Sequence, residues 1–328
     1  MLTDTVGAMR VVLPHPIQYQ GSKRVLAARI LAQFPAQVHT LYEPFAGSAA
    51  LSIAAAAGGH AERFAVNDLN RPLALLLERI VNQPRQVADR YEALWQAQGE
   101  SVEASVQHFN DVRERFNASQ SPEHLLFLLS RCIKGAVRYN REGQFNQSPD
   151  KRRRGTRPET MRRNILGVSS LLKGRASFTS LDYAQAVADA TPADVIYMDP
   201  PYQGVSGERD ARYVAGLDFD AFVAALESFN ARGLRYMVSY DGSLGARRYG
   251  VALPAHLRLK RLELIAGRSS QATLLGRDEV TVESLYLSPV LLDDLAGGRR
   301  QPRWPAPIDS LPLFHEATNE TPVFSGVS

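Results

Sequence analysis

The sequence is poor in cysteine and has no long hydrophobic run. Its 328 residues include one cysteine, Cys132, which excludes an intramolecular disulfide and a thiolate-rich zinc site. No run of about 18 apolar residues occurs, so no transmembrane helix is expected. Residues 1–10 lack the basic segment and apolar core of a signal peptide. These absences favour a cytoplasmic protein without membrane association.

The positive charge of the chain is clustered rather than large. The formal net charge is only +4, yet residues 151–163 contain seven basic residues and one acidic residue. A solvated loop is the ordinary interpretation of such a run. Here, however, aromatic and amide side chains precede the run directly, in residues 138–147. Such a mixture can read bases while the arginines bind phosphates, so the pattern predicts contact with DNA.

Residues 193–202 hold the pattern on which the functional argument depends. Residues 195–198 are mainly apolar and predict a short buried strand. Residues 199–202 read Asp-Pro-Pro-Tyr, and the two prolines end the strand and stiffen its exit. A carboxylate, a fixed carbonyl and an aromatic ring therefore lie at the carboxyl end of a strand, where open α/β sheets bind ligands. The alternative is an ordinary strand followed by a polyproline turn.

A second pattern, near the N-terminus, is typical of a nucleotide-binding βαβ unit. Residues 40–51 predict a strand, a loop of small residues around Gly47, and an alanine-rich helix. The next predicted strand, residues 63–67, leads to Asp68, which is 21 residues after Gly47. At this spacing an acidic residue reaches a ribose diol. The loop has only one glycine, which does not favour a nicotinamide cofactor. The alternative for Asp68 is a helix-capping aspartate in an ordinary βαβ unit.

The rest of the chain predicts alternating helical and extended regions. Apolar spacing indicates helices over residues 25–34, 73–82, 87–98, around 109–116, and over 122–134, 161–173 and 219–230. Strands are expected over residues 177–183, 234–240, 258–265 and 280–287, with a turn at 241–242 and polar loops at 203–213 and 267–277. A turn at residues 141–143 between aromatic and polar arms predicts a hairpin.

Four stretches resemble the alpha-group DNA adenine-N6 methyltransferases, the family of the GATC-type DNA adenine methylases. Residues 19–23, Tyr-Gln-Gly-Ser-Lys, are similar to the family's Trp-Ala-Gly-Gly-Lys motif, and residues 43–47 to Glu-Pro-Phe-x-Gly. Residues 199–202 match the catalytic motif, and residues 138–146 match the recognition hairpin. The Val-Pro-Phe-Gly that follows this hairpin in the family is absent, so the resemblance does not extend to a recognition sequence.

The resemblance implies an α/β fold with a Rossmann-like methyltransferase sheet. Residues 1–71 and 172–288 would form the catalytic domain, and residues 72–171 an inserted helical and hairpin region that recognises the DNA target. From residue 289 to 328, proline, glycine and polar residues predict a flexible C-terminal tail.

The resemblance also implies roles for individual residues. Catalysis is expected from Asp199, Pro200 and Tyr202. Binding of the cofactor S-adenosylmethionine is expected from Tyr19, Lys23, Glu43, Phe45, Gly47, Asp68, Asp182, Tyr183 and Asp199. DNA contact is expected from Arg138, Tyr139, Asn140, Arg141, Asn146, Lys151, Arg152, Arg153, Arg154, Arg268 and Ser269. The alternative for Lys23, taken by itself, is a solvated side chain. The alternative for Asp182 and Tyr183 is a strand-end turn. No metal is expected.

The implied reaction is methyl transfer to the N6 amino group of an adenine flipped out of double-stranded DNA. The amino lone pair is delocalised into the ring, so acceptors for its hydrogens, such as the Asp199 carboxylate and the Pro200 carbonyl, favour attack. In a restriction-modification role, a cognate restriction endonuclease is a further implied partner, in a bacterial or phage-infected cell. Two alternatives stay open: a cytosine-N4 methyltransferase, disfavoured by aspartate at 199, and a non-catalytic DNA-binding protein. Methylation at a cytosine carbon needs a cysteine nucleophile. The only cysteine, Cys132, is predicted to lie in an apolar helix, which disfavours that reaction.

Overall fold

The structure is a computed structural model that describes residues 13–135, 137–201, 217–244, 247–249, 252–268 and 280–297. Tyr202, Ser269 and the predicted loop at 203–213 lie outside these ranges. Within them, no helix is both long and apolar enough to cross a membrane.

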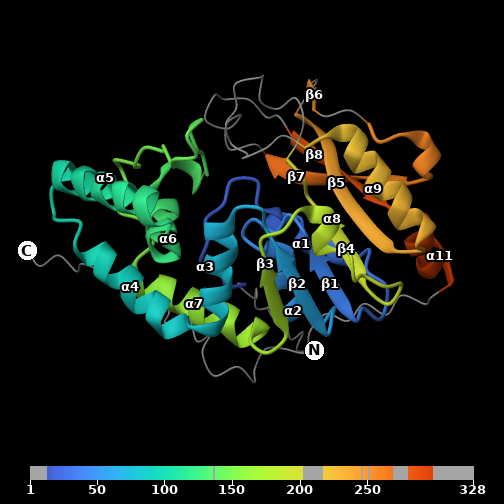
Figure 1. Cartoon of the computed structure of the whole chain (residues 1–328), viewed down its shortest axis with the longest axis horizontal. Helices are drawn as coiled ribbons and strands as arrows, with labels where there is room; N and C mark the ends of the chain where they lie inside the picture. Colours follow the sequence, from blue (N-terminus) through green and yellow to red (C-terminus); the bar gives the residue numbers. More distant parts are fainter. Residues whose placement is uncertain are drawn as a thin grey trace, which may run out of the picture.

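A mixed β-sheet forms the centre of the molecule (Figure 1). Its strands lie in the order β3-β2-β1-β4-β5-β8-β7, and β6 pairs with β5. The first five are parallel, β8 is antiparallel to its neighbours β5 and β7, and β7 therefore runs in the same direction as the first five. Their bounds are β1 Thr40–Glu43, β2 Arg63–Asn67, β3 Ala176–Thr179, β4 Val195–Met198, β5 Arg235–Leu244, β6 Arg247–Tyr249, β7 Lys260–Arg268 and β8 Val280–Leu287. This arrangement confirms the Rossmann-like fold.

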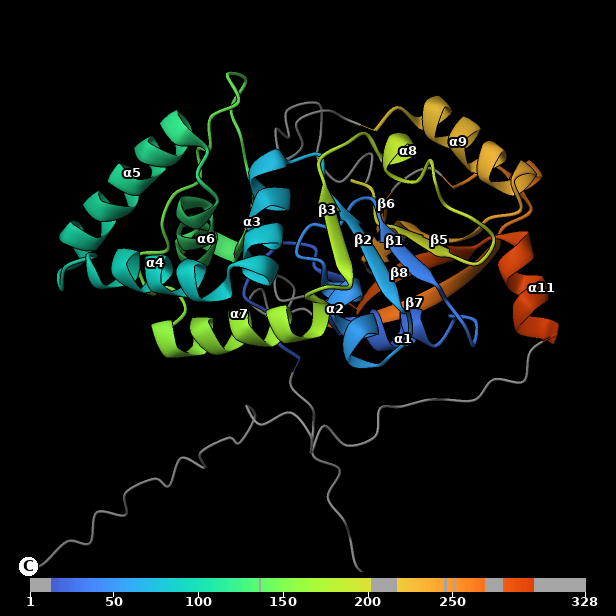
Figure 2. The same ribbon diagram turned by 60° about the horizontal axis from the view of Figure 1, so that its bottom comes forward.

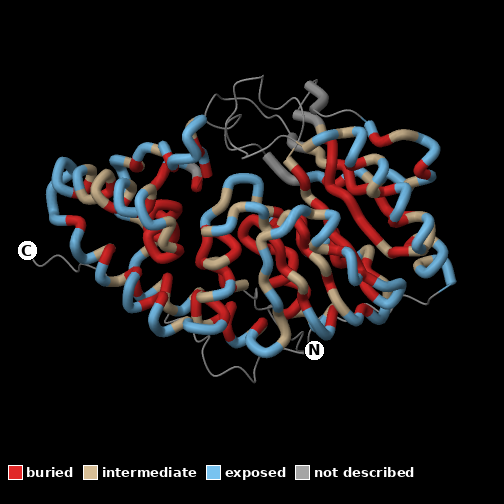
Figure 3. The backbone as a smooth tube through the Cα atoms, viewed as in Figure 1, coloured by how far each residue is buried: buried red, intermediate tan, exposed pale blue. Residues whose placement is uncertain are grey.

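Strand β4 is central because both of its faces are buried. Val195 and Tyr197 face one hydrophobic core, while Ile196 and Met198 face the other. On the first side lie α1 (Ala27–Leu31), α2 (Ala50–Ala57) and α11 (Pro289–Gly297); on the second lie α8 (Tyr183–Ala186) and α9 (Phe219–Ala231). Figure 2 shows these layers edge-on, and Figure 3 shows the buried strands between more exposed helices. The residue after β4 therefore emerges from a rigid, fully packed strand.

A group of helices lies beside β3, at one end of the sheet (Figures 1 and 2). It contains α3 (Arg71–Asn82), α4 (Pro84–Gln96), α5 (Val102–Ser119), α6 (Pro122–Arg131) and α7 (Pro158–Leu172). Proline occupies the first turn of all of these except α5. In the first turn of a helix, the missing N–H of proline costs no helical hydrogen bond. The hairpin between α6 and α7 is present, with Tyr139 bridged to Phe145. The proposed division into a catalytic domain and an inserted region stays a prediction that this arrangement supports.

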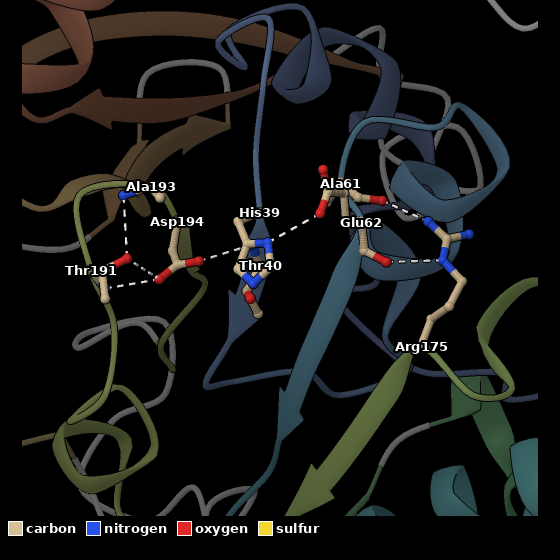
Figure 4. A network of polar contacts seen from close by, with 8 residues as sticks. All are labelled: His39, Thr40, Ala61, Glu62, Arg175, Thr191, Ala193 and Asp194. Carbon is tan, nitrogen blue, oxygen red and sulfur yellow. Dashed lines mark hydrogen bonds and ion pairs between the residues drawn. The ribbon is translucent and has the colours of Figure 1, made fainter.

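The amino-terminal edge of the sheet is tied together by polar contacts to the backbone (Figure 4). The Asp194 carboxylate accepts from the Thr40 backbone N–H at 2.9 Å, which joins the starts of β4 and β1. Arg175, just before β3, donates to the carbonyl oxygens of Ala61 and Glu62 before β2 at 2.6 and 3.0 Å. These contacts hold the strand starts in register, so the opposite, carboxyl edge has a fixed frame.

Several predicted elements need correction. The segment from residue 289 onward begins with helix α11, so the expected flexible tail is wrong for residues 289–297, where Leu291 is buried against the core. Strand β5 continues through residues 241–242, where a turn was expected. The predicted helix over residues 25–34 is a 3₁₀ turn, Lys23–Val25, followed by the short α1. Strand β3 ends at Thr179, and Tyr183 begins α8.

Candidate active site

Asp199 and Lys23 meet at the carboxyl end of β4. The Lys23 ammonium lies 2.8 Å from the Asp199 carboxylate and 3.2 Å from the Glu283 carboxylate. Only 7% of the Lys23 side chain is exposed, so the alternative of a solvated lysine is wrong. A buried ammonium needs such partners, because removing a charge from water is costly. The sequence had predicted sites at both Lys23 and Asp199, but gave no signal for their contact or for Glu283.

Glu43, the last residue of β1, is buried against the first turn of α2. One carboxylate oxygen accepts from the Ser52 backbone N–H at 3.0 Å and from its hydroxyl at 2.6 Å. Burial, with a smaller contribution from the nearby Asp199 charge, raises the Glu43 pKa to about 7 against the lowering effect of the Ser52 hydrogen bonds. Glu43 thus anchors α2 to β1 beneath the loop that carries Gly47. Its expected contact with the cofactor stays a prediction.

Gly47 lies directly beneath the Tyr19 ring. Its φ of +52° favours glycine, and a Cβ atom there would lie 3.1 Å from Cε1 of Tyr19. The hydroxyls of Ser22 and Ser48 lie 3.0 Å apart and join the two loops. The motifs at residues 19–23 and 43–47 therefore pack against each other, with the Tyr19 ring directly on the Gly47 backbone.

Asp68 lies at the end of β2, where the sequence had placed it, and it contacts the Gly47 loop. Its carboxylate accepts from the backbone N–H groups of Gly47 at 2.8 Å and Asn70 at 2.9 Å. Burial raises the Asp68 pKa, while these two hydrogen bonds lower it. The 21-residue spacing thus brings a carboxylate onto the glycine loop. Its predicted role with a ribose stays a prediction.

The Asn67 side chain connects three strand ends, a role that the sequence analysis missed. It donates to the carbonyl oxygens of Pro44 and Leu181 at 2.9 and 3.0 Å. It accepts from the Thr179 hydroxyl and the Leu181 N–H, both at 2.8 Å. Asparagine can make all four bonds because its amide carries both donors and acceptors. The loops after β1 and β3 are therefore held together.

An aromatic pair borders the same edge. The rings of Phe45 and Tyr183 stack with centroids 5.3 Å apart and an interplanar angle of 26°. Tyr183 also meets Phe222 of α9 edge-on. Asp182 caps α8 by accepting from the Ala184 N–H at 2.9 Å. The structure thus brings Phe45 and Tyr183 together, and binding by either residue stays a prediction.

The predicted DNA-contact residues of the hairpin divide into exposed and buried groups. Arg138, Arg141 and Asn146 are exposed. Tyr139 is 8% exposed, and its hydroxyl donates to the Asn70 side chain at 3.3 Å. Its ring therefore supports the hairpin from within instead of offering a surface to DNA, which corrects the expected role. The Asn140 side chain accepts from the backbone N–H groups of residues 142 and 144, so it holds the turn.

The side chains of the basic run, Lys151 to Arg154, are exposed, while its backbone is held from beneath. Buried Arg131 donates to the carbonyl oxygens of Asp150, at 2.8 Å, and Arg153. Arg153 pairs with Asp150, and the Arg154 guanidinium lies 5.2 Å from the Trp95 ring centroid. An internal guanidinium thus fixes the backbone of a loop whose cationic side chains face outward.

The remaining predicted residues lie at the limits of the described chain. Arg268 is the last residue of β7 and not part of a loop, so its expected loop position is wrong. Ser269 and Tyr202 lie outside the described residues. Pro200 is buried directly after Asp199. Among the residues that can be described, no cluster of histidine, cysteine, aspartate or glutamate could hold a metal ion.

Comparison with known proteins gives one family over most of the chain. Residues 19–249 match the D12 class N6 adenine-specific DNA methyltransferases. The modification methylase StsI of Streptococcus sanguinis is 27% identical over 71% of the chain, which spans 36% of that protein. The retron Ec67 DNA adenine methylase of Escherichia coli is 26% identical over 78% of the chain and 88% of its own length. For the DNA N-6-adenine-methyltransferase of Escherichia phage P1, identity is 26% over 70% of the chain and 30% of the phage protein.

Proposed function

The chain belongs to the D12 class of N6 adenine-specific DNA methyltransferases, and we propose that its carboxyl-edge site moves a methyl group from S-adenosylmethionine to N6 of adenine in double-stranded DNA. The observation that carries this assignment is the convergence of Lys23, Asp199 and the Gly47 loop at one edge of the sheet. The family match does not favour cytosine N4 as the target.

The donor set suits S-adenosylmethionine, which supplies an electrophilic methyl group when it is bound. The absence of a side chain at Gly47 lets the Tyr19 ring pack directly on the loop backbone, where any side chain at 47 would push the ring away. Asp68, at the end of β2, is the acceptor for ribose hydroxyls. The stacked Phe45 and Tyr183 rings offer an apolar border to a purine.

Asp199 and Pro200 act on the target amino group in this proposal. The Asp199 carboxylate and the Pro200 carbonyl accept its two hydrogens, so the nitrogen lone pair turns toward the methyl group. The nitrogen gains positive charge as the new N–C bond forms, and the Asp199 carboxylate stabilises that charge. The nitrogen then loses one proton, for which Asp199 is the acceptor. Tyr202, outside the described residues, is assigned to stacking on the base.

The DNA-binding surface comprises the exposed hairpin residues and the basic run. The base must leave the duplex to reach Asp199, at a cost of a few kcal/mol, and phosphate contacts by residues 151–154 offset that cost. The name of the StsI enzyme as a modification methylase suggests a cognate restriction endonuclease as a partner. Bacterial and phage relatives suggest the cytoplasm of a bacterium as the place of action.

The reaction is tested by incubating the protein with unmethylated duplex DNA and methyl-labelled S-adenosylmethionine. The DNA is then digested, and the labelled nucleoside is identified by its mass. Label in 6-methyladenine is expected. Label in 4-methylcytosine would move the target to cytosine, and DNA binding without label would favour a non-catalytic protein.

The DNA-binding surface is tested with the triple variant Arg152→Ala, Arg153→Ala, Arg154→Ala. Affinity for duplex DNA should fall, and the slope of log K against log salt should flatten by about 1 to 3, because each lost phosphate contact removes about 0.9 from the slope. Arg162→Ala is the matched control, since Arg162 is already paired with Asp89 and Glu92 at 2.7 Å. An unchanged slope in the triple variant would make the run an ordinary solvated loop.

A further inference from the structure

Arg131 lies at the centre of a buried polar network beneath the basic run of residues 151–154. Only 2% of Arg131 is exposed. Besides its contacts to the carbonyl oxygens of Asp150 and Arg153, it donates to the Ser105 hydroxyl of α5 at 2.9 Å. Its own carbonyl oxygen accepts from the Asp150 backbone N–H at 2.7 Å. A guanidinium carries five donors in a fixed fork, so this one side chain holds several acceptors in set positions.

Two more buried side chains bind carbonyl oxygens farther along the same loop. Gln98, between α4 and α5, donates to the Arg154 carbonyl oxygen at 3.2 Å, and the Tyr91 hydroxyl of α4 donates to that of Thr156 at 2.7 Å. The Ser105 hydroxyl links Gln98 to the rest of the network by donating to its side-chain oxygen at 3.3 Å. Buried donors therefore hold four backbone carbonyl oxygens of this loop, those of residues 150, 153, 154 and 156.

The loop also fits closely against α6 at Gly155. The φ of Gly155 is +84°, and a Cβ atom there would lie 2.8 Å from Oγ of Ser130 and 3.1 Å from Cδ of Arg131. Only glycine accepts both this conformation and this approach without strain. The backbone thus rests directly on the residues that bind its carbonyl oxygens.

The network has two consequences for the charges of the loop. A carbonyl oxygen is the negative end of the peptide dipole, and four of these oxygens point to buried donors while the side chains of residues 151–154 are exposed. The cations therefore reach outward without these four oxygens beside them. Because folding has already fixed the backbone, a phosphate that meets the loop does not have to order it, which lowers the cost of binding.

We propose that Arg131 is a positioning residue for DNA binding: it sets the backbone of residues 150–156 so that the cations of residues 151–154 meet DNA phosphates together. The inference rests on the proposed DNA-binding surface. Arg131 acts from beneath the loop, through the carbonyl oxygens that it holds. A buried guanidinium is costly to remove from water, and here that cost is offset by contacts that all serve one exposed basic segment.

The test is the salt dependence of duplex binding by Arg131→Met, measured by fluorescence anisotropy on the full chain. Methionine is of similar length but cannot donate hydrogen bonds. The slope of log K against log salt should flatten by about 1 to 3, because each lost phosphate contact removes about 0.9. Arg175→Met is the matched control: it removes the same charge and also frees two backbone carbonyl oxygens, but at the amino edge of the sheet. It should keep the wild-type slope.

A double-mutant cycle separates this role from a merely structural one. If Arg131 acts through the basic run, adding Arg131→Met to the triple variant of residues 152–154 should change the slope by less than about 1, because the contacts are already lost. Gly155→Ala displaces the loop and leaves every charge in place, so it should also flatten the slope. It is the second variant if Arg131→Met does not fold, as judged by circular dichroism.

Two results would overturn the inference. One is a wild-type slope in folded Arg131→Met, whether or not its affinity is lower, and the other is a full additional loss of slope when Arg131→Met is combined with the triple variant. An unchanged slope in the triple variant alone would instead overturn the proposed DNA-binding role of the basic run. The failure of the inference and the failure of the proposed surface are therefore distinct.

Discussion

Strand β4 has an aspartate on each side, and the two carboxylates are held in different ways. Asp194 precedes the strand and is 3% exposed. It accepts from the Thr40 N–H at 2.9 Å and from the N–H and hydroxyl of Thr191, both at 2.8 Å. Asp199 follows the strand, is 20% exposed, and pairs with the ammonium of Lys23 at 2.8 Å.

Under the proposed function, the same residue type serves structure at one edge of the sheet and chemistry at the other. The donors to Asp194 are neutral groups fixed by the backbone, so its carboxylate closes a loop and joins two strands. Asp199 pairs with a charge on a long side chain, the Lys23 ammonium. The opposite edges of this sheet are therefore expected to respond differently to equivalent substitutions.

The largest effect is expected for Asp199→Ala. Loss of the carboxylate should lower the single-turnover rate of methyl transfer by at least about 10³-fold, because removing one such electrostatic contact costs about 10² to 10³ in rate and here a hydrogen acceptor is lost as well. DNA affinity, measured by fluorescence anisotropy, should stay near the wild-type value. A variant that lost DNA binding instead would refute the assigned role.

Asp194→Ala should produce the opposite result. Three hydrogen bonds to a buried carboxylate are lost, so the free energy of unfolding in urea should fall by about 4 kcal/mol. The transfer rate per folded molecule should change little, because Asp194 lies one strand length from the site. A stable Asp194→Ala protein with a low rate would break the distinction between the two edges.

Glu43→Gln tests the protonation of the buried Glu43 side chain through the pH dependence of stability. The folded pKa of Glu43, about 7, exceeds its ordinary value of 4.5, so the folded protein keeps a proton that the unfolded chain releases. Wild-type stability therefore falls as pH rises through this window. Glutamine does not titrate, so between pH 4.5 and 8 the variant should gain about 3 kcal/mol of unfolding free energy relative to wild type.

The matched control for Glu43→Gln is Glu62→Gln. Glu62 precedes β2 at the amino edge and is 76% exposed. Both variants are unfolded by urea across the same pH series, together with the wild type. A constant difference between Glu43→Gln and wild type at all pH values would show that the Glu43 carboxyl does not keep its proton in the folded state.

The smallest effects are expected for a pair of glycine substitutions. Gly47 and Gly174 both have positive φ, +52° and +76°, so alanine at either position should cost about 1 to 2 kcal/mol of stability. At Gly174, before β3, a Cβ atom has no neighbour within 4 Å, while at Gly47 it meets Tyr19. Only Gly47→Ala should also weaken S-adenosylmethionine binding in calorimetry. Equal donor affinities in the two variants would remove Gly47 from the binding surface.

Local patterns were sufficient for the regular elements near the site. The predicted strand over residues 280–287 has the bounds of β8, and Asp199 follows β4 as expected. Both signals depend on neighbouring residues: alternation of apolar side chains and the conformational restriction of proline. The short α11 was missed because its apolar residues lie next to a long polar, proline-rich segment.

Contacts across the sheet could not be predicted, because they depend on strand order. Nothing near Lys23 indicates that β4 and β8 bring Asp199 and Glu283 to it. In the same way, Tyr139 appears in a polar, basic segment, and only the docking of the hairpin against Asn70 buries it. A polar neighbourhood in sequence therefore does not establish that an aromatic ring is exposed.

The place of β8 in the strand order has a consequence for how the enzyme is made. Lys23 and Glu283 stand 260 positions apart, and β8 is added between β5 and β7. Much of the sheet precedes β8 in the chain, so a ribosome releases Lys23 long before Glu283. A partly synthesised chain, or one cut before β8, lacks Glu283, so only the completed chain can form the Lys23–Glu283 contact.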